Sequence, residues 1–258
     1  QRPPLSKAYL LGEMALERLF LRPESFYAEH GINLMLDTTV EAIDTSAQTI
    51  HVDGTGIAYD ELVLTTGSVP RGLPARIGGA LDGVHVVRNL ADVDAMSPLS
   101  DGSELAVDFV IVGVGIEAAT KLADAAGITN DNGIKTDAYG RTSSPHVWAA
   151  GDCASFPYRG QRIRLESVPN AIDQAECVAG NIMGDNKEYV AKPWFWSDQY
   201  DVKLQIAGLN TGYDRVITRR TDADSVAFWY YRGDELLAVD AMNDPRGFMI
   251  GRRLIEAG

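Results

Sequence analysis

Two short apolar runs, each leading directly into a loop of small residues, constrain the fold of this chain more than any other feature. Leu62 to Leu64 leads into Thr65-Thr66-Gly67, and Val147 to Ala150 leads into Gly151-Asp152. Apolar runs without alternation are typical of strands buried on both faces, as in the parallel sheets of α/β proteins. Such sheets bind ligands at the carboxyl ends of their strands. A carboxylate at that point, such as Asp152, can accept hydrogen bonds from the hydroxyls of a sugar or sugar alcohol.

Charge and length exclude several classes of protein. The net charge is −13, from 23 basic and 36 acidic residues among 258, which argues against nucleic acid as a partner because phosphate backbones require a basic surface. The apolar stretches are shorter than the about 20 residues that cross a bilayer. The start, Gln1-Arg2-Pro3-Pro4, has no apolar signal segment. We therefore expect a cytoplasmic protein without a membrane partner, and the absence of an initiator methionine suggests that the natural N-terminus is missing.

The two cysteines, Cys153 and Cys177, show no metal-binding or dithiol spacing. Zinc ligands and redox-active dithiols occur as closely spaced pairs, and none is present. We expect no metal site and no disulfide framework, and we interpret both residues as small hydrophobic side chains in a reducing cytosol.

One glycine-rich segment resembles a nucleotide-binding loop without meeting its requirements. Residues Gly113 to Ala118 follow a predicted strand at 109–112 and precede a predicted helix at 117–126, which is the context of a dinucleotide fingerprint. However, the third glycine position holds Ala118, and Glu117 places a negative charge where a phosphate should bind. We favour a tight strand-to-helix turn here, while a true nucleotide loop stays open.

Hydrophobic periodicity and turn signals predict the remaining elements. The predicted strands lie at 32–36, 39–43, 49–52, 57–59 and 84–87, and the predicted helices at 23–30, 89–96 and 168–183. From Lys192 onward, strand-like segments dominate the sequence. Strands are predicted at 202–206, 215–219, 226–231 and 236–241, and a closing helix at 248–255. This last part is expected to form a small α+β domain.

Taken singly, the loop at Thr65-Thr66-Gly67 is explained somewhat better as a strand ending in a turn than as a ligand-binding loop, and Asp152 is explained about equally well as a helix or turn cap. Together, and in this order, they resemble flavoprotein motifs: Thr65-Thr66-Gly67 resembles the ATG motif of flavoproteins with two dinucleotide-binding domains, and Thr142 to Asp152 resembles their second FAD motif. Residues 2–7, 166–175 and 194–200 are similar to the ferredoxin reductases of bacterial oxygenase systems, the putidaredoxin reductase-like enzymes. The resemblance covers almost the whole chain.

The resemblance implies an FAD site. Lys7 would approach the flavin ring, Val40 would hold the adenine end through its backbone, and Arg88 would meet the phosphate or ribose side. Thr65, Thr66 and Gly67 would line the FAD, and Asp152 would bind the ribityl hydroxyls.

The same resemblance implies roles for three residues nearer the flavin ring. Val168 would offer its backbone N–H to a flavin carbonyl at a helix N-terminus, where negative charge is stabilised. Trp196 would pack near the isoalloxazine edge, and Glu166 would lie where the nicotinamide enters. No histidine occupies a motif typical of catalysis, so no catalytic acid or base is expected.

The sequence also departs from this family in two places. The family opens with a strand and a glycine-rich loop for the FAD pyrophosphate, whereas this chain begins after them. The family also carries an inserted NAD(P) domain of roughly a hundred residues, whereas here Asp92 to Met96 is followed almost at once by Asp101 to Val112. We place the junction at 97–102.

We therefore predict an α/β fold, namely an incomplete flavoprotein fold of the two-dinucleotide-binding-domain type, with a C-terminal α+β domain. Residues 1–96 would be the first part of the FAD domain, 97–112 a remnant of the NAD(P) domain with the junction, 113–191 the second part of the FAD domain, and 192–258 the C-terminal reductase domain.

The parent function implied by the resemblance is FAD-dependent electron transfer from NAD(P)H, as co-substrate, to an iron–sulfur ferredoxin. The alternative is an inactive flavin-fold fragment or deletion product without FAD or NAD(P)H turnover. A dithiol reductase is disfavoured because paired cysteines are absent. The sequence does not decide between NADH and NADPH, and it leaves a homodimer open.

Overall fold

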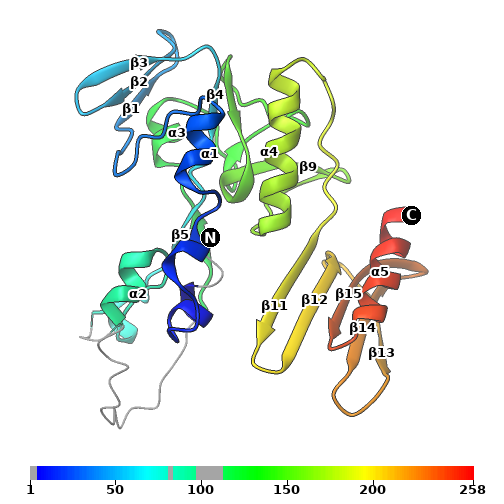
Figure 1. Cartoon of the computed structure of the whole chain (residues 1–258). Coiled ribbons are helices and arrows are strands. Elements are labelled where there is room, and N and C mark those ends of the chain that lie inside the picture. The colour runs from blue at the N-terminus through cyan, green and yellow to red at the C-terminus, as the bar shows by residue number, and fades with distance from the viewer. Residues whose placement is uncertain (1–4, 81–83, 97–112) are drawn as a thin grey trace. The chain divides into compact units, whose positions relative to one another are not determined.

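The computed structural model describes residues 5–80, 84–96 and 113–258 (Figure 1). The strand predicted at 109–112 therefore lies outside the described residues, as does the predicted junction. The chain divides into two compact units. The first contains residues 1–40 and 68–117, and the second contains residues 41–67 and 118–258.

The first unit consists of short elements around a small apolar cluster. They are a π-helical turn Leu5–Tyr9, 3-10 turns Leu16–Leu19 and Ala75–Ile77, α1 (Glu24–Glu29), α2 (Leu90–Met96), β5 (Ser68–Pro70) and β6 (Ile116–Ala118), which ends at the boundary of the second unit. Leu5, Leu19 and Val93 are buried together. The helix predicted at 89–96 is confirmed, because Asn89 Oδ1 accepts the N–H of Asp92 at 3.0 Å and so caps α2.

Several predicted elements of this unit are wrong. Residues 32–36 and 84–87 form no strand, and side chains such as Ile32 and Leu36 are exposed. An apolar run becomes a strand only where a neighbouring strand completes its hydrogen bonds, and none pairs with these segments among the described residues.

The glycine-rich segment also differs from its prediction. Ile116 to Ala118 forms β6, which pairs with β5, and the following helix α3 (Lys121–Ala125) begins at Lys121 rather than at Glu117. Arg71 holds this arrangement, since its N–H donates to Gly115 O at 3.1 Å and its guanidinium lies 3.7 Å from the Glu117 carboxylate. The segment thus lacks the adjoining helix N-terminus that a phosphate loop requires.

The second unit holds the remaining elements. Its first part contains β1 (Ala42–Asp44), β2 (Thr49–Val52), β3 (Thr55–Ala58), β4 (Leu62–Leu64), α3, β7 (Ile134–Lys135), β8 (Val147–Ala149), a 3-10 turn Gly151–Cys153, β9 (Ala154–Tyr158), β10 (Gln161–Ile163) and α4 (Val168–Ile182). β1 to β3 form an antiparallel sheet, whereas β4 and β8 form a parallel pair. The predicted strand at 39–43 is therefore only partly correct, because pairing begins at Ala42.

The core of this part surrounds the β4–β8 pair. Leu64, Val147 and Ala149 are buried there with Ile134 and Cys153, as expected for unalternating apolar strands. The helix predicted at 168–183 is confirmed as α4 (Figure 1).

The C-terminal part forms a five-stranded antiparallel sheet in the order β11-β12-β15-β14-β13. Its elements are β11 (Trp194–Gln199), β12 (Val202–Gly208), β13 (Arg215–Arg220), β14 (Val226–Arg232), β15 (Glu235–Met242) and α5 (Pro245–Ala257). α5 packs on β15 and β12, burying Phe248 and Ile255 against Val239 and Ala241. All four strands and the helix predicted for this region are confirmed.

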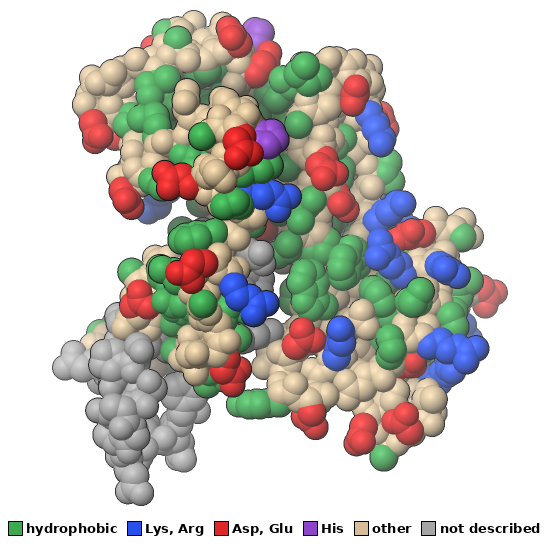
Figure 2. All heavy atoms as spheres, viewed as in Figure 1, with side chains coloured by type: hydrophobic (Ala, Val, Ile, Leu, Met, Phe, Trp, Pro, Cys, Tyr) green, Lys and Arg blue, Asp and Glu red, His purple; other side chains and the backbone are tan. Residues whose placement is uncertain are grey.

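Two observations concern the surface. Acidic side chains are scattered over several elements on the face drawn in Figure 2 rather than gathered in one place, so this face shows no single acidic patch. Among the described residues, no helix is both long enough and apolar enough to span a bilayer, and no cluster of three or more His, Cys, Asp or Glu side chains could hold a metal ion.

Glu61 links the amino ends of β4 and β8, and we expect this contact to be pH-dependent. Trp148 Nε1 donates to its carboxylate at 2.6 Å, and His146 Nδ1 lies 2.9 Å from it. The Trp148 hydrogen bond lowers the pKa of Glu61, burial opposes this effect, and His146 adds to the lowering. A carboxyl group with a lowered folded-state pKa stabilises the fold above its unfolded pKa and loses that contribution as the pH falls through the folded pKa.

Glu61→Gln should therefore lower the free energy of unfolding by about 1 kcal/mol at pH 7, a modest value because the side chain is partly exposed. The difference between wild type and variant should shrink as the pH falls through the acidic range, measured by urea unfolding at several pH values. A difference that stays constant down to pH 3 would contradict this account.

Candidate functional site

The parallel register of β4 and β8 brings the two strand-end loops to one edge. Leu62 pairs with Val147 and Leu64 with Ala149, and the N–H of Ala150 donates to Leu64 O at 3.1 Å. Because both strands run in the same direction, residues 65–67 and 150–152 leave the sheet side by side. Both loops therefore lie at the carboxyl ends of a parallel strand pair, which is where α/β sheets bind ligands.

The first loop is fixed by two hydrogen bonds to Ala119. Thr66 Oγ1 donates to Ala119 O at 2.7 Å, and the N–H of Ala119 donates to Gly67 O at 2.9 Å. Gly67 has a φ of +68°, in the left-handed region that favours glycine. Thr65 and Thr66 are exposed. The Thr66 hydroxyl proton is thus used within the protein.

The second loop is held by α4. The N–H of Gly151 donates to Gln174 Oε1 at 2.9 Å, and Gln174 is 1% exposed. Gly151 has a φ of +81°, and a Cβ there would lie 3.5 Å from Ala171 Cβ. Gln174 was not among the predicted site residues, although an amide on the same face of the predicted helix as Ala171 and Val178 was a signal that could have identified it.

Arg164 was also missed, and it connects two of the predicted residues. Its Nη1 donates to Asp152 O at 3.0 Å, and its Nη2 lies 2.8 Å from Glu166 Oε1. The Arg164 side chain is 9% exposed, whereas that of Glu166 is 42% exposed. Gly133 provides the space, because a Cβ there would approach Arg164 Cδ to 2.9 Å and Cys153 O to 2.7 Å. A buried guanidinium therefore lies directly beneath the turn that carries Asp152.

Val168 is the first residue of α4, and its side chain is exposed. Ser167 caps the helix by accepting the N–H of Asn170 at 3.3 Å, and the Tyr189 hydroxyl donates to Asn170 Oδ1 at 2.8 Å. The first turn of a helix carries partial positive charge and N–H groups without intrahelical acceptors. This helix N-terminus is suited to an electron-rich oxygen of a ligand.

The other predicted site residues lie elsewhere. Trp196 is on β11, which contacts α4, and its ring stacks on that of Trp194 with centroids 5.3 Å apart. Lys7 lies in the π-helical turn, Val40 precedes β1 without belonging to a strand, and the backbone N–H of Arg88 donates to Asp92 Oδ2 at 2.8 Å. These last three belong to the first unit.

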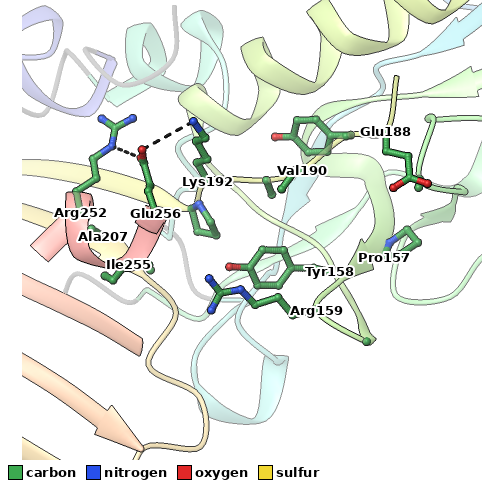
Figure 3. Close-up of a pocket in the computed structure, with 16 residues that line it drawn as sticks. Pro157, Tyr158, Arg159, Glu188, Val190, Lys192, Ala207, Arg252, Ile255 and Glu256 are labelled. Carbon is green, nitrogen blue, oxygen red and sulfur yellow. Dashed lines mark hydrogen bonds and ion pairs between the residues drawn. The ribbon is translucent and has the colours of Figure 1, made fainter. Parts of the chain in front are cut away.

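A cavity of about 320 Å³ lies apart from the predicted residues (Figure 3). It is lined by β9, the 188–193 segment, the end of β12 and α5, and it includes none of the ten predicted site residues. Glu256 accepts from Arg252 at 2.8 Å and lies 3.8 Å from Lys192 Nζ, and Arg159 lies 3.7 Å from Glu235. Because four charged residues of its lining, Arg159, Lys192, Arg252 and Glu256, already form ion pairs, the chemistry of the strand-end edge is the better guide to function.

The residues at the strand-end edge fit a ligand with a flat ring and a polyhydroxyl chain. The edge offers the exposed residues Thr65 and Thr66, the half-buried residue Asp152 with its carboxylate, and the N-terminus of α4 at Val168. A buried cation, Arg164, stands behind them. Small residues allow a planar group to lie close to the backbone, and the carboxylate accepts hydroxyl protons.

Comparison with known proteins agrees with this arrangement. The pyridine nucleotide-disulphide oxidoreductase family model matches residues 1–100 and 97–175, and the reductase C-terminal model matches residues 194–258. The chain belongs to the putidaredoxin reductase-like ferredoxin reductases of that flavoprotein family. The predicted family and fold class are thereby confirmed.

Individual relatives cover the whole chain. It is 33% identical to a ferredoxin–NAD(P)(+) reductase of Sphingomonas sp, over 100% of this chain and 84% of the relative. It is 32% identical to putidaredoxin reductase CamA of Pseudomonas putida, over 98% and 82%. The reductase in a crystal structure of the covalent putidaredoxin reductase–putidaredoxin complex superposes with a TM-score of 0.90 at 30% identity, covering 99% of this chain and 83% of that one.

These matches also show where this chain differs from its relatives. The match to the Sphingomonas reductase extends over 347 residues, although this chain has 258. The relative therefore has residues within the matched span that have no counterpart here. The oxidoreductase model likewise matches in two pieces, which meet at residues 97–100.

Proposed function

We propose that this chain binds FAD at the strand-end edge and passes electrons from NAD(P)H through it to an iron–sulfur ferredoxin. The observation that carries the proposal is the parallel pairing of β4 and β8, which brings Thr66-Gly67 and Asp152 to one edge. The family membership supports the reaction, since the relatives are named as reductases of ferredoxins. The two free cysteines are compatible with a reducing cytoplasm as the site of action.

Each predicted residue has a proposed part in holding the cofactor. Asp152 would accept hydrogen bonds from the ribityl hydroxyls, residues 65–67 would line the ligand with their backbone, and the Val168 N–H would bind a ring carbonyl. Trp196 would cover the edge of the ring, and Glu166 would lie where the nicotinamide enters.

The residues proposed for the remainder of FAD lie in the first unit. Lys7 would approach the ring, Val40 would bind the adenine end and Arg88 the phosphate or ribose. The bound flavin would supply the redox chemistry, because it can accept a hydride and release single electrons. The protein then needs to position and shield it rather than provide an acid or base.

A second candidate function follows from the missing internal residues. The relatives have internal residues that this chain lacks. A chain without them can retain the flavin edge and lose the nucleotide loop of the NAD(P) domain. We accordingly propose the domain divisions 1–96, 97–112, 113–191 and 192–258, with the interruption in the second of them. In this case FAD binds, but NAD(P)H does not reduce it.

Titration with FAD followed by two reductants separates these possibilities. The purified chain should bind FAD with oxidised-flavin absorbance near roughly 450 nm. Bleaching of this band by NADH or NADPH, and onward reduction of added putidaredoxin, supports the reductase. Bleaching by dithionite alone supports the second candidate. Failure to retain any FAD would contradict the flavin site itself.

A further inference from the structure

The Arg164 guanidinium is a buried cation without full hydrogen-bond satisfaction. Its side chain is 9% exposed, and its Nε has no acceptor among the residues that the structure describes. Removing a charge from water costs free energy unless partners compensate it. The presence of this guanidinium at the turn that carries Asp152 indicates that its charge or its geometry serves a function there.

The two partners of Arg164 have different roles, one structural and one electrostatic. Nη1 donates to the backbone carbonyl of Asp152 at 3.0 Å, which fixes the turn. Nη2 contacts the Glu166 carboxylate at 2.8 Å, which neutralises the guanidinium. Glu166 lies in the segment between β10 and α4, two residues before Val168. The pair thus connects the two places where the proposed ligand would meet the second unit.

We propose that Arg164 is a positioning residue and that the Arg164–Glu166 pair sets the reduction potential of the bound flavin. This inference rests on the proposed function, because it requires FAD at this edge. A reduced flavin carries more negative charge than an oxidised one. A nearby cation therefore stabilises the reduced form, and a nearby carboxylate destabilises it.

The two partners consequently have opposite predicted effects. Arg164→Gln removes the cation and leaves the carboxylate, so the reduced form should become less favoured. Glu166→Gln leaves the cation without its counter-charge, so the reduced form should become more favoured. Each change should alter the ratio of reduced to oxidised flavin about tenfold at a fixed ambient potential, equivalent to about 30 mV for a two-electron couple. The double variant should return close to wild type.

Equilibration with a redox dye, followed by absorbance, measures this ratio without turnover by the enzyme. Arg164→Lys keeps the charge and should stay within about twofold of wild type. Arg159→Gln removes the same charge from an exposed position in the turn after β9 and should also leave the ratio unchanged.

Opposite shifts for Arg164→Gln and Glu166→Gln support the inference, whereas shifts in one direction, or none, overturn it. If Arg164→Gln does not retain FAD, the decision rests on Glu166→Gln and Arg164→Lys, which both keep the cation beneath the turn. If the wild-type chain binds FAD but the variants show no opposite shifts, only this inference is wrong. If the wild-type chain binds no FAD, the proposed function is wrong as well.

Discussion

Gly208→Ala is expected to lower the stability of the C-terminal domain by about 3–5 kcal/mol. Gly208 ends β12 with a φ of +76°, and a Cβ at this position would lie well inside 3.0 Å of the Leu237 carbonyl oxygen. It would also approach Ala238 Cα to 3.0 Å. Backbone atoms of the neighbouring strand cannot rotate away as a side chain can, so the β12–β15 pairing itself would have to shift.

The matched control is Gly212→Ala. Gly212 has a similar φ of +84°, but a Cβ there meets nothing within 4 Å. Only the left-handed backbone conformation would then be penalised, at about 1–2 kcal/mol. Urea unfolding followed by tryptophan fluorescence is suitable, because Trp194, Trp196 and Trp229 belong to this sheet. Equal losses in the two variants would show that the close approach to Leu237 does not matter.

Gly208 illustrates what sequence patterns reveal and what they omit. The strands around it were predicted because Val226 to Tyr231 and its neighbours are rich in β-branched and aromatic residues separated by turn signals. The need for glycine at position 208 arises from a contact with β15, about 30 residues later in the chain. Local composition does not encode such a contact.

The strand-end edge likewise has some residues that the sequence reveals and others that it does not. The loops at Thr66 and Asp152 were identified because small and acidic residues after an apolar run have a local signature. Arg164 and Gln174 were missed because their importance comes from what they contact. The hydrogen bond of Gln174 to the Gly151 N–H and that of Arg164 to the Asp152 carbonyl exist only after the chain has folded.

The incorrect elements have a physical cause as well. Ile32 to Leu36 has the composition of a strand but no partner strand among the described residues, so its side chains remain exposed. Glu117 and Ala118 were expected at the start of a helix, yet both belong to β6, which pairs with β5. In both cases tertiary hydrogen bonding, rather than local propensity, decides the conformation.

Asp152→Ala is expected to weaken FAD binding about 100-fold, since hydrogen bonds to a charged acceptor contribute about 1.5–3 kcal/mol and each 1.4 kcal/mol changes the dissociation constant tenfold. The fold should survive, because the turn is held through backbone atoms. Gly151 N–H binds Gln174, and the Asp152 carbonyl accepts from Arg164. The substitution therefore removes the carboxylate while keeping these two hydrogen bonds of the turn.

Fluorescence titration of the chain with FAD measures the effect, with Asp152→Asn and Asp131→Ala beside it. Asparagine keeps an acceptor oxygen without the charge and should lose about tenfold. Asp131 is an exposed carboxylate that lies 3.9 Å from Arg162, and its removal changes the net charge equally without touching the edge. If Asp131→Ala weakened binding as much as Asp152→Ala, the loss would reflect overall charge. A selective loss would instead support the ribityl-binding role of Asp152, which the parallel strands bring to the same edge as Gly67.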